Sequence, residues 1–339
     1  MNQIGARLGL FTATTAAILW AGCGQQSKPV TGGPSASGGA PASTPGATKA
    51  GYTVGFAQVG AESSWRTAET DSIKGEAEQR GVTLKFSDAQ GKQENQIKAV
   101  RGFIAQGVDA IILAPVVETG WEPVLKEAKQ AGIPVVLVDR GLKVADESLY
   151  ATLIASDFVA EGRMAAEWLV KKTGGKASII ELQGTPGAAP AIDRKKGFEE
   201  GLKEHVDMKI IASQSGDFRR SVGKEVAEAL LKVHGTKVTA VYAHNDDMAL
   251  GAIQAIEEAG RKPGVDVIVV SIDGVKGAFE AMVKGTLNCS VECSPLLGPL
   301  AFDAVEKALA GVELPKKTIV DDQVYDTTTA KDVIDSRKY

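Results

Sequence analysis

From Gly51 to the C-terminus, short apolar runs alternate with longer stretches in which apolar residues recur at helical spacing. The apolar runs predict strands at residues 53–57, 83–86, 110–114, 134–138, 149–154, 177–182, 209–212, 238–243 and 267–272. The stretches between them predict helices at residues 65–80, 93–106, 117–131, 158–172, 192–204, 221–233 and 246–259. This regular alternation predicts an α/β fold.

The repeated strand–helix units predict parallel sheets that are covered by helices on both faces. The same succession of elements occurs twice along the chain, which favours two similar lobes over one large sheet. We expect the first lobe to end near Ala155, where the run at residues 149–154 stops and a new helical stretch begins.

Polar residues follow several of the predicted strands at the point where each strand ends. In open parallel sheets, ligands bind beyond the carboxyl ends of the strands, so residues that are distant in the sequence can converge there. The pattern therefore predicts one site, built from Trp65, Arg66, Asp139, Arg140, Asn245 and Asp273.

The residue types of this predicted site suit a sugar. A carboxylate accepts hydrogen bonds from neighbouring hydroxyl groups, a guanidinium donates through a planar fork, and an amide does both. An aromatic ring such as that of Trp65 can cover the apolar C–H face of the sugar.

Each of these residues also has a simpler interpretation. Asp139 and Arg140 could form a local ion pair, Asn245 could be only a helix N-cap, and Asp273 before a glycine could begin a turn. Arg194 lies among charged neighbours at residues 193–196, which is typical of a solvated helix face.

The N-terminus has the features of an export signal. Arg7 precedes an apolar segment at residues 8–20, and Ala21-Gly22-Cys23 follows. The pattern resembles bacterial lipoproteins, in which the cysteine is acylated, although Trp20 stands where an aliphatic residue is usual. We therefore expect residues 1–23 to form a lipoprotein signal segment that ends at Cys23; an ordinary signal peptide or a short uncleaved anchor are the alternatives.

Residues 24–51 are rich in Gly, Ser, Pro, Ala and Thr, which predicts a flexible tether.

The chain of 339 residues has 44% apolar residues, enough for two packed domains, and its formal charge of -4 argues against a nucleic-acid surface. The sequence contains neither a nucleotide-binding glycine motif nor a cluster with metal-ligand spacing, so we expect no cofactor and no metal.

The remaining cysteines, Cys289 and Cys293, lie in one short run. If that run is extended, their α-carbons are about 13 Å apart, beyond the roughly 7 Å that a disulfide spans. We therefore expect two separate thiols.

Longer motifs connect the chain to a known family. From Tyr52 onward it resembles the periplasmic sugar-binding proteins of ABC importers, in the ribose and galactose branch, and is particularly similar to galactofuranose-binding members. The motifs that carry the resemblance are residues 55–56, 64–66, 138–140, 192–194, 244–248 and 271–274, together with the longer runs 58–60, 94–101, 115–117, 119–128, 213–218 and 242–247.

The resemblance implies a type I periplasmic-binding-protein fold, in which two similar lobes, each a parallel sheet flanked by helices, are joined by a three-segment hinge. It implies a first lobe of residues 52–154 and 294–323 and a second lobe of residues 155–293 and 324–339, with a helix at residues 296–309 in the first. It also implies a shared binding site. The first lobe would supply Glu62, Trp65, Arg66, Asp139 and Arg140, and the second lobe Arg194, Asn245 and Asp273.

The function implied is capture of a monosaccharide by hinge closure, with galactofuranose or a related hexose as the expected cargo. Ribose is not expected, because ribose-binding relatives have Gln at the position of Cys293. The implied partners are the permease and ATPase subunits of an importer, and we expect a lipid-anchored monomer in the periplasm or on the outer face of a membrane.

Other functions are less consistent with the sequence. The same domain could serve as a sugar sensor that presents its closed form to a membrane receptor or kinase. A sugar-responsive repressor would need a DNA-binding helix-turn-helix before residue 52, where a signal and a tether stand instead. A glycosidase could use Asp139 and Asp273, but nothing in the sequence raises the pKa of either carboxyl group, so we expect a protein that is not an enzyme.

Overall fold

The computed structural model describes residues 51–339. The predicted signal segment, the predicted lipid attachment at Cys23 and nearly all of the predicted tether lie outside these residues. Within the described part of the chain, no helix is both long and apolar enough to cross a membrane.

The described chain forms two sheets of six strands, and helices flank both. The first sheet has the strand order β11-β5-β4-β3-β1-β2 and its strands are all parallel. Its strands are β1 (Thr53–Gln58), β2 (Thr83–Asp88), β3 (Ala110–Leu113), β4 (Val135–Val138), β5 (Thr152–Ser156) and β11 (Lys317–Val320). The helices of this first lobe are α1 (Ser64–Gln79), α2 (Gln93–Ala105), α3 (Glu122–Gln130) and α9 (Gly298–Leu309).

The second sheet repeats this plan with the order β12-β10-β9-β8-β6-β7, and only β12 runs antiparallel to its neighbour. Its strands are β6 (Ala177–Gln183), β7 (Met208–Ser215), β8 (Ala240–Ala243), β9 (Ile268–Asp273), β10 (Cys289–Glu292) and β12 (Val324–Asp326). The helices of this second lobe are α4 (Phe158–Thr173), α5 (Ala189–Leu202), α6 (Arg220–His234), α7 (Asp246–Glu258), α8 (Lys276–Lys284) and α10 (Ala330–Val333).

Both faces of the first sheet are buried, as the apolar runs predict. Ile112 on β3 packs into one hydrophobic cluster, while its neighbours Ile111 and Leu113 pack into another. Successive strand residues point to opposite faces, so the two clusters lie on opposite sides of the sheet. The α/β fold with two similar lobes is confirmed.

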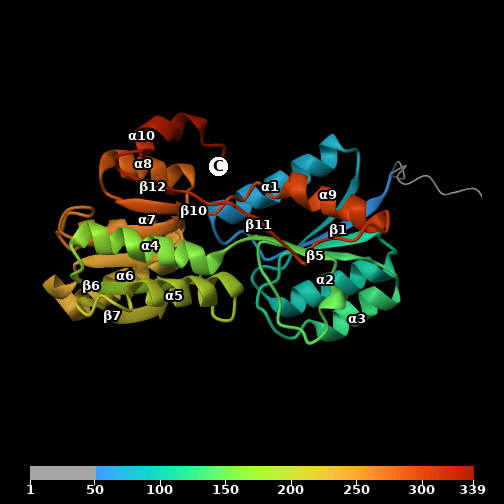
Figure 1. Cartoon of the computed structure of the whole chain (residues 1–339), viewed down its shortest axis with the longest axis horizontal. Helices are drawn as coiled ribbons and strands as arrows, with labels where there is room; N and C mark the ends of the chain where they lie inside the picture. Colours follow the sequence, from blue (N-terminus) through green and yellow to red (C-terminus); the bar gives the residue numbers. More distant parts are fainter. Residues whose placement is uncertain (1–50) are drawn as a thin grey trace, which may run out of the picture. The chain divides into compact units, whose positions relative to one another are not determined.

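The chain passes between the sheets in three places. It leaves the first sheet after β5, returns between β10 and α9, and leaves again between β11 and β12. As a result, α9 packs against α1, although more than 200 residues separate them in the sequence, and Figure 1 shows the two helices side by side. The three-segment hinge of the predicted fold is present.

One predicted helix begins later than its periodicity indicates. The stretch at residues 117–131 becomes helical only at Glu122, because Gly120 adopts a positive φ of 86° and Pro123 lies in the first turn. The indole of Trp121 donates a hydrogen bond to the carbonyl of Val117 at 2.6 Å, which stabilises the non-helical loop before the helix.

Glycines allow α4 and α5 to pack at very short range. A Cβ atom on Gly197 would lie 2.0 Å from the carbonyl oxygen of Val159, and one on Gly162 would lie 2.2 Å from that of Arg194. This contact positions Arg194 on α5 relative to the residues of α4.

Replacing Gly197 by Ala should lower the free energy of unfolding by about 1–3 kcal/mol, because the added methyl overpacks the contact between α4 and α5. Urea denaturation measures the change. Gly75→Ala on α1 is the matched control, since a Cβ there meets nothing within 4 Å. Equal stability of the two variants would contradict the close packing.

The hinge contains a carboxyl group with an unusual pKa. Asp322, between β11 and β12, accepts a hydrogen bond from the hydroxyl of Ser156 at 3.0 Å. Burial, reinforced by the nearby charge of Glu161, raises the pKa of Asp322 to about 8. The folded protein therefore holds a proton that an unfolded chain, with a carboxyl pKa of about 3.9, has already released.

Because the unfolded state binds fewer protons between these two pKa values, the stability of the folded state falls as the pH rises from about 4 to about 8. The Asp322→Asn variant lacks this titration, so its stability relative to the unchanged protein should increase with pH over that interval. Thermal unfolding at about pH 5 and pH 8 checks this expectation. A difference in melting temperature that is the same at both pH values would refute it.

Candidate functional site

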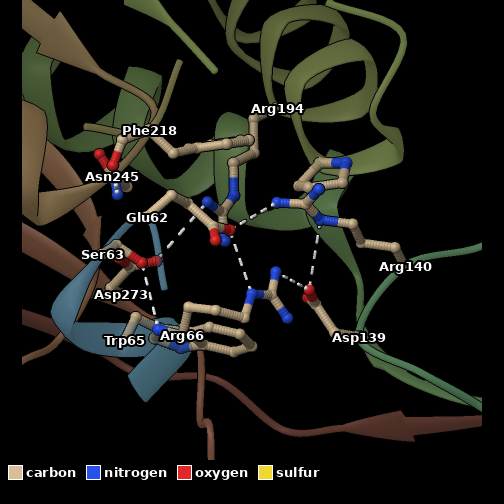
Figure 2. Close-up of a pocket in the computed structure, with 11 residues that line it drawn as sticks. Glu62, Ser63, Trp65, Arg66, Asp139, Arg140, Arg194, Phe218, Asn245 and Asp273 are labelled. Atoms are coloured by element: carbon tan, nitrogen blue, oxygen red, sulfur yellow. Dashed lines mark hydrogen bonds and ion pairs between the residues drawn. The ribbon is translucent and has the colours of Figure 1, made fainter. Parts of the chain in front are cut away.

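The side chains predicted from the sequence surround one cavity between the two lobes. Figure 2 shows them converging, and the space between them is about 280 Å³, part of which opens to solvent. The lining residues are Glu62, Ser63, Trp65, Arg66, Asp139, Arg140, Pro190, Arg194, Phe218, Asn245 and Asp273. All the predicted site residues are among them, whereas Ser63, Pro190 and Phe218 were not predicted.

Helix N-termini position part of this lining. Ser63 is the N-cap of α1, and its side chain accepts a hydrogen bond from the backbone N–H of Arg66 at 3.1 Å. Asn245 is the N-cap of α7 and accepts from the N–H of Met248 at 3.0 Å. Its amide also donates to the carbonyl of Phe218 at 3.1 Å, so capping and cavity lining coexist in Asn245.

Two aspartates at strand ends have an uncommon backbone conformation. Asp139 follows β4 with a φ of 60°, and Asp273 ends β9 with a φ of 132°. Such values cost energy for a residue other than glycine and are concentrated at functional sites. The turn interpretation of Asp273 is compatible with its place in the cavity wall.

Arg66 is surrounded by three carboxylates of the first lobe. Its Nε donates to Glu62 at 3.1 Å, its Nη2 donates to Asp139 at 2.6 Å, and its Nη1 donates to Glu69. Only 2% of Arg66 is exposed, so these bonds replace the water that the guanidinium has lost.

Arg140 extends from the first lobe towards the second. It donates to the carbonyl of Val116 at 3.2 Å and to Glu62 at 3.3 Å, and its Nε lies 3.5 Å from Asp139. Its guanidinium also stacks over the ring of Phe218 in the second lobe, 5.3 Å from the centroid. The pair formed by Asp139 and Arg140 is therefore buried and is not a surface ion pair.

Arg194 has a similar environment in the second lobe. Its Nε donates to Glu161 on α4 at 2.7 Å, its Nη1 donates to the carbonyl of His244 at 2.7 Å, and the same nitrogen lies 3.6 Å from Asp273. Since Arg194 is 3% exposed, it is not on a solvated helix face.

The carboxyl groups of the site respond to burial in different ways. Burial alone would raise the pKa of Glu62, but the cations of Arg66 and Arg140 hold it below its ordinary value. Burial raises the pKa of Asp273 well above its usual range, and Arg194 opposes the shift only in part. Nothing in the sequence indicated the raised pKa of Asp273, because the sequence does not reveal that this residue is buried.

Several polar atoms of the cavity wall have no hydrogen-bond partner in the described structure. They are Glu62 Oε2, Arg140 Nε and Asp273 Oδ2, all of which are buried. Buried polar groups are normally paired, and an unpaired one costs about 1–3 kcal/mol. Glu62 Oε2 therefore offers an acceptor and Arg140 Nε a donor to a polar ligand, and the carboxyl group of Asp273 accepts when it is ionised and can also donate when it is protonated.

The lobes also contact each other directly around the cavity. The backbone N–H and the hydroxyl of Ser64 donate to Asp247 on α7 at 2.8 and 2.6 Å. The indole of Trp65 donates to the carbonyl of Cys293 at 2.6 Å, and the N–H of Glu118 donates to the carbonyl of Gly187 at 3.0 Å. The lobes are thus held closed over the cavity.

The thiols of Cys289 and Cys293 are both free and buried, so they are separate, as expected. Among residues 51–339, no group of three or more His, Cys, Asp or Glu side chains could hold a metal ion.

The periplasmic binding protein domain matches residues 54–313. The chain belongs to the periplasmic binding protein family. It is 56% identical to the galactofuranose-binding protein YtfQ of Escherichia coli, over 84% of this chain and 91% of that protein.

Solved structures of this family show the same fold. One is the binding component of an arabinose ABC transporter from a Shewanella species, bound to α- and β-L-arabinofuranose: it is 56% identical, with a TM-score of 0.83 over 84% of this chain and 95% of that one. Another, from Mycobacterium smegmatis in complex with β-D-fucofuranose, is 50% identical, with a TM-score of 0.83 over 85% of this chain and 95% of that one.

Proposed function

We propose that this periplasmic binding protein captures a neutral monosaccharide in its furanose form and delivers it to the permease of an ABC importer. The observation that carries the proposal is the set of buried, unpaired polar atoms around one cavity between the lobes. Hydroxyl groups both donate and accept, so a polyol can pair with the carboxyl oxygens of Glu62 and Asp273 and with the N–H of Arg140.

The lining also supplies apolar surface. Trp65 and Phe218 both line the cavity, Trp65 from the first lobe and Phe218 from the second. Aromatic faces suit the C–H surface of a sugar ring, and the neighbouring hydroxyl groups find polar partners. The mixture favours a small, uncharged, ring-shaped ligand over an extended or purely apolar one.

The relatives support a furanose of one stereochemical series. One relative is named for galactofuranose, and the two solved structures contain L-arabinofuranose and D-fucofuranose. These sugars have the same arrangement of substituents on the furanose ring and differ in the exocyclic group. We infer that this chain recognises the same ring, with galactofuranose as the leading candidate.

Closure provides the capture mechanism. A ligand that touches both lobes stabilises the closed form, since it makes fewer contacts when the lobes are apart. The bonds from Ser64 to Asp247 add to the closed form without touching the cavity. The sugar would be bound and released without any bond being made or broken, so we propose that the protein is not an enzyme.

We also propose that the protein acts as a monomer that docks to a permease driven by an ATPase. Its membership of the periplasmic binding protein family implies export to the periplasm. Acylation of Cys23 would attach the protein to a membrane, and residues 24–51 would provide the reach to a permease. Metabolic labelling with a fatty-acid analogue, compared with a Cys23→Ala variant, tests the anchor.

Calorimetric titration of the purified protein with D-galactose, L-arabinose, D-fucose and D-ribose tests sugar capture. We expect binding of the sugars of the galactose series and recovery of each sugar unchanged. The Asp139→Asn variant should weaken this binding by about 100-fold or more, since it removes one partner of a buried charge pair. Asp303→Asn, at an exposed ion pair of α9, is the matched control.

The absence of binding across the panel would reject sugar capture, and conversion of any sugar would reject the non-enzymatic mechanism. A selective effect of Asp139→Asn, with Asp303→Asn unchanged, would assign the binding to the cavity.

The direct contact between the lobes makes a different prediction. Asp247→Asn weakens the bonds from Ser64 and the ion pair with Arg220, but it leaves the cavity wall unchanged. It should therefore weaken binding of every sugar by about the same factor, mainly through faster release. Stopped-flow measurements with L-arabinose and D-galactose check this; a changed ratio between the two affinities would argue against a role confined to closure.

A further inference from the structure

Two buried carboxylates lie directly behind the arginines of the cavity and do not line it. Glu69 is on α1, one helical turn after Arg66, and Glu161 is on α4, against Arg194. Both glutamates are 0% exposed. Burying a carboxylate costs stability, because the charged group loses its water. Burial accordingly raises the pKa of both Glu69 and Glu161, and one oxygen of Glu69 has no hydrogen-bond partner. Their position therefore needs an explanation beyond packing.

Glu69 accepts a hydrogen bond from the guanidinium nitrogen of Arg66 that the cavity residues Glu62 and Asp139 do not contact. Glu62 and Asp139 accept from Nε and Nη2, and Glu69 accepts from Nη1. The amide of Gln58 donates to the same oxygen of Glu69 at 3.0 Å and holds the carboxylate in place. Each nitrogen of this guanidinium is thus already bonded to a carboxylate of the protein.

Glu161 has the corresponding position in the second lobe. It accepts from Nε of Arg194 at 2.7 Å, while Nη1 donates to the backbone carbonyl of His244. The short packing of Gly162 against the carbonyl of Arg194 keeps α4 and α5 at this separation. Glu161 is therefore held against the guanidinium by the packing of the two helices.

These contacts leave Arg66 and Arg194 with fewer free donors for a charged ligand. An unpaired guanidinium fork binds a carboxylate or a phosphate through two parallel hydrogen bonds. The cavity wall contains three arginines and three carboxylates, so its formal charges balance. When ionised, Glu69 and Glu161 add two further negative charges just behind it. A ligand anion would then meet excess negative charge around paired guanidinium groups, with Arg140 Nε still available as a donor.

We propose that Glu69 and Glu161 are specificity-determining residues that make the site select neutral sugars and reject their acidic counterparts, such as uronic acids. This inference rests on the proposed sugar-binding function and adds the basis of its charge selectivity. The two glutamates act through Arg66 and Arg194 and make no contact with the ligand.

The test compares D-galactose with D-galacturonate, which has the same ring configuration and a carboxylate at C6. Titrations of the full protein are run at about pH 8, so that buried carboxyl groups with raised pKa values are ionised as far as possible. The variants are Glu69→Gln, Glu161→Gln and the double variant, which keep the side-chain shape and remove the charge.

We expect the protein to bind galactose and to discriminate against galacturonate. In the double variant the ratio of the two affinities should shift towards galacturonate by at least about tenfold, the effect of making one guanidinium donor available to a charged acceptor. Glu167→Gln, an exposed glutamate on α4, and Glu76→Gln on α1 are matched controls and should leave the ratio unchanged.

The conservative variants Glu69→Asp and Glu161→Asp keep the negative charge and should keep the original ratio even where affinity falls. They also serve if a Gln variant does not fold, as judged by its thermal unfolding. A double Gln variant that binds galactose with the original ratio overturns the inference, and so does an Asp variant that shifts towards galacturonate. If the unchanged protein binds no sugar, the proposed function itself fails.

Discussion

The binding region depends on keeping three arginines charged out of contact with water. Arg66, Arg140 and Arg194 are each no more than 3% exposed. Removing an ion from water costs several kcal/mol, which only well-placed carboxylates and carbonyls can offset. The buried arginines therefore need the carboxylates of the cavity wall, together with Glu69 and Glu161 behind it, to remain charged. Because each partner restrains the others, the polar groups of the cavity are oriented before a ligand arrives.

Dividing these charges between two lobes connects recognition with movement. The first lobe holds Arg66 and Arg140 and the second holds Arg194, and the chain passes three times between them. A ligand can satisfy both sets of polar atoms only when the lobes are closed. The contacts of Ser64 with Asp247 and of Trp65 with Cys293 belong to the same closed arrangement, so part of its stability comes from the protein alone.

Local backbone chemistry sets the positions of these groups. The N-caps of α1 and α7 begin two helices and also belong to the cavity wall, so one hydrogen-bonding pattern serves folding and recognition. The positive φ values of Asp139 and Asp273 turn the chain at the ends of β4 and β9. Glycine contacts between α4 and α5 then determine how closely the helix that carries Arg194 approaches its neighbour.

The sequence by itself determined the succession of strands and helices, because strands buried on both faces are apolar along their length. It also indicated the polar residues at strand ends, and the family motifs added Glu62 and Arg194. It did not predict the helix α8, nor three of the strands, from periodicity: β10 carries the polar residues Ser290 and Glu292, and β11 and β12 are short and partly exposed. Only the tertiary structure decided that Glu69 and Glu161 are buried behind arginines. A charged residue on an amphipathic helix has the same pattern whether it faces water or a partner, and that partner is chosen by packing between segments that are distant in the sequence.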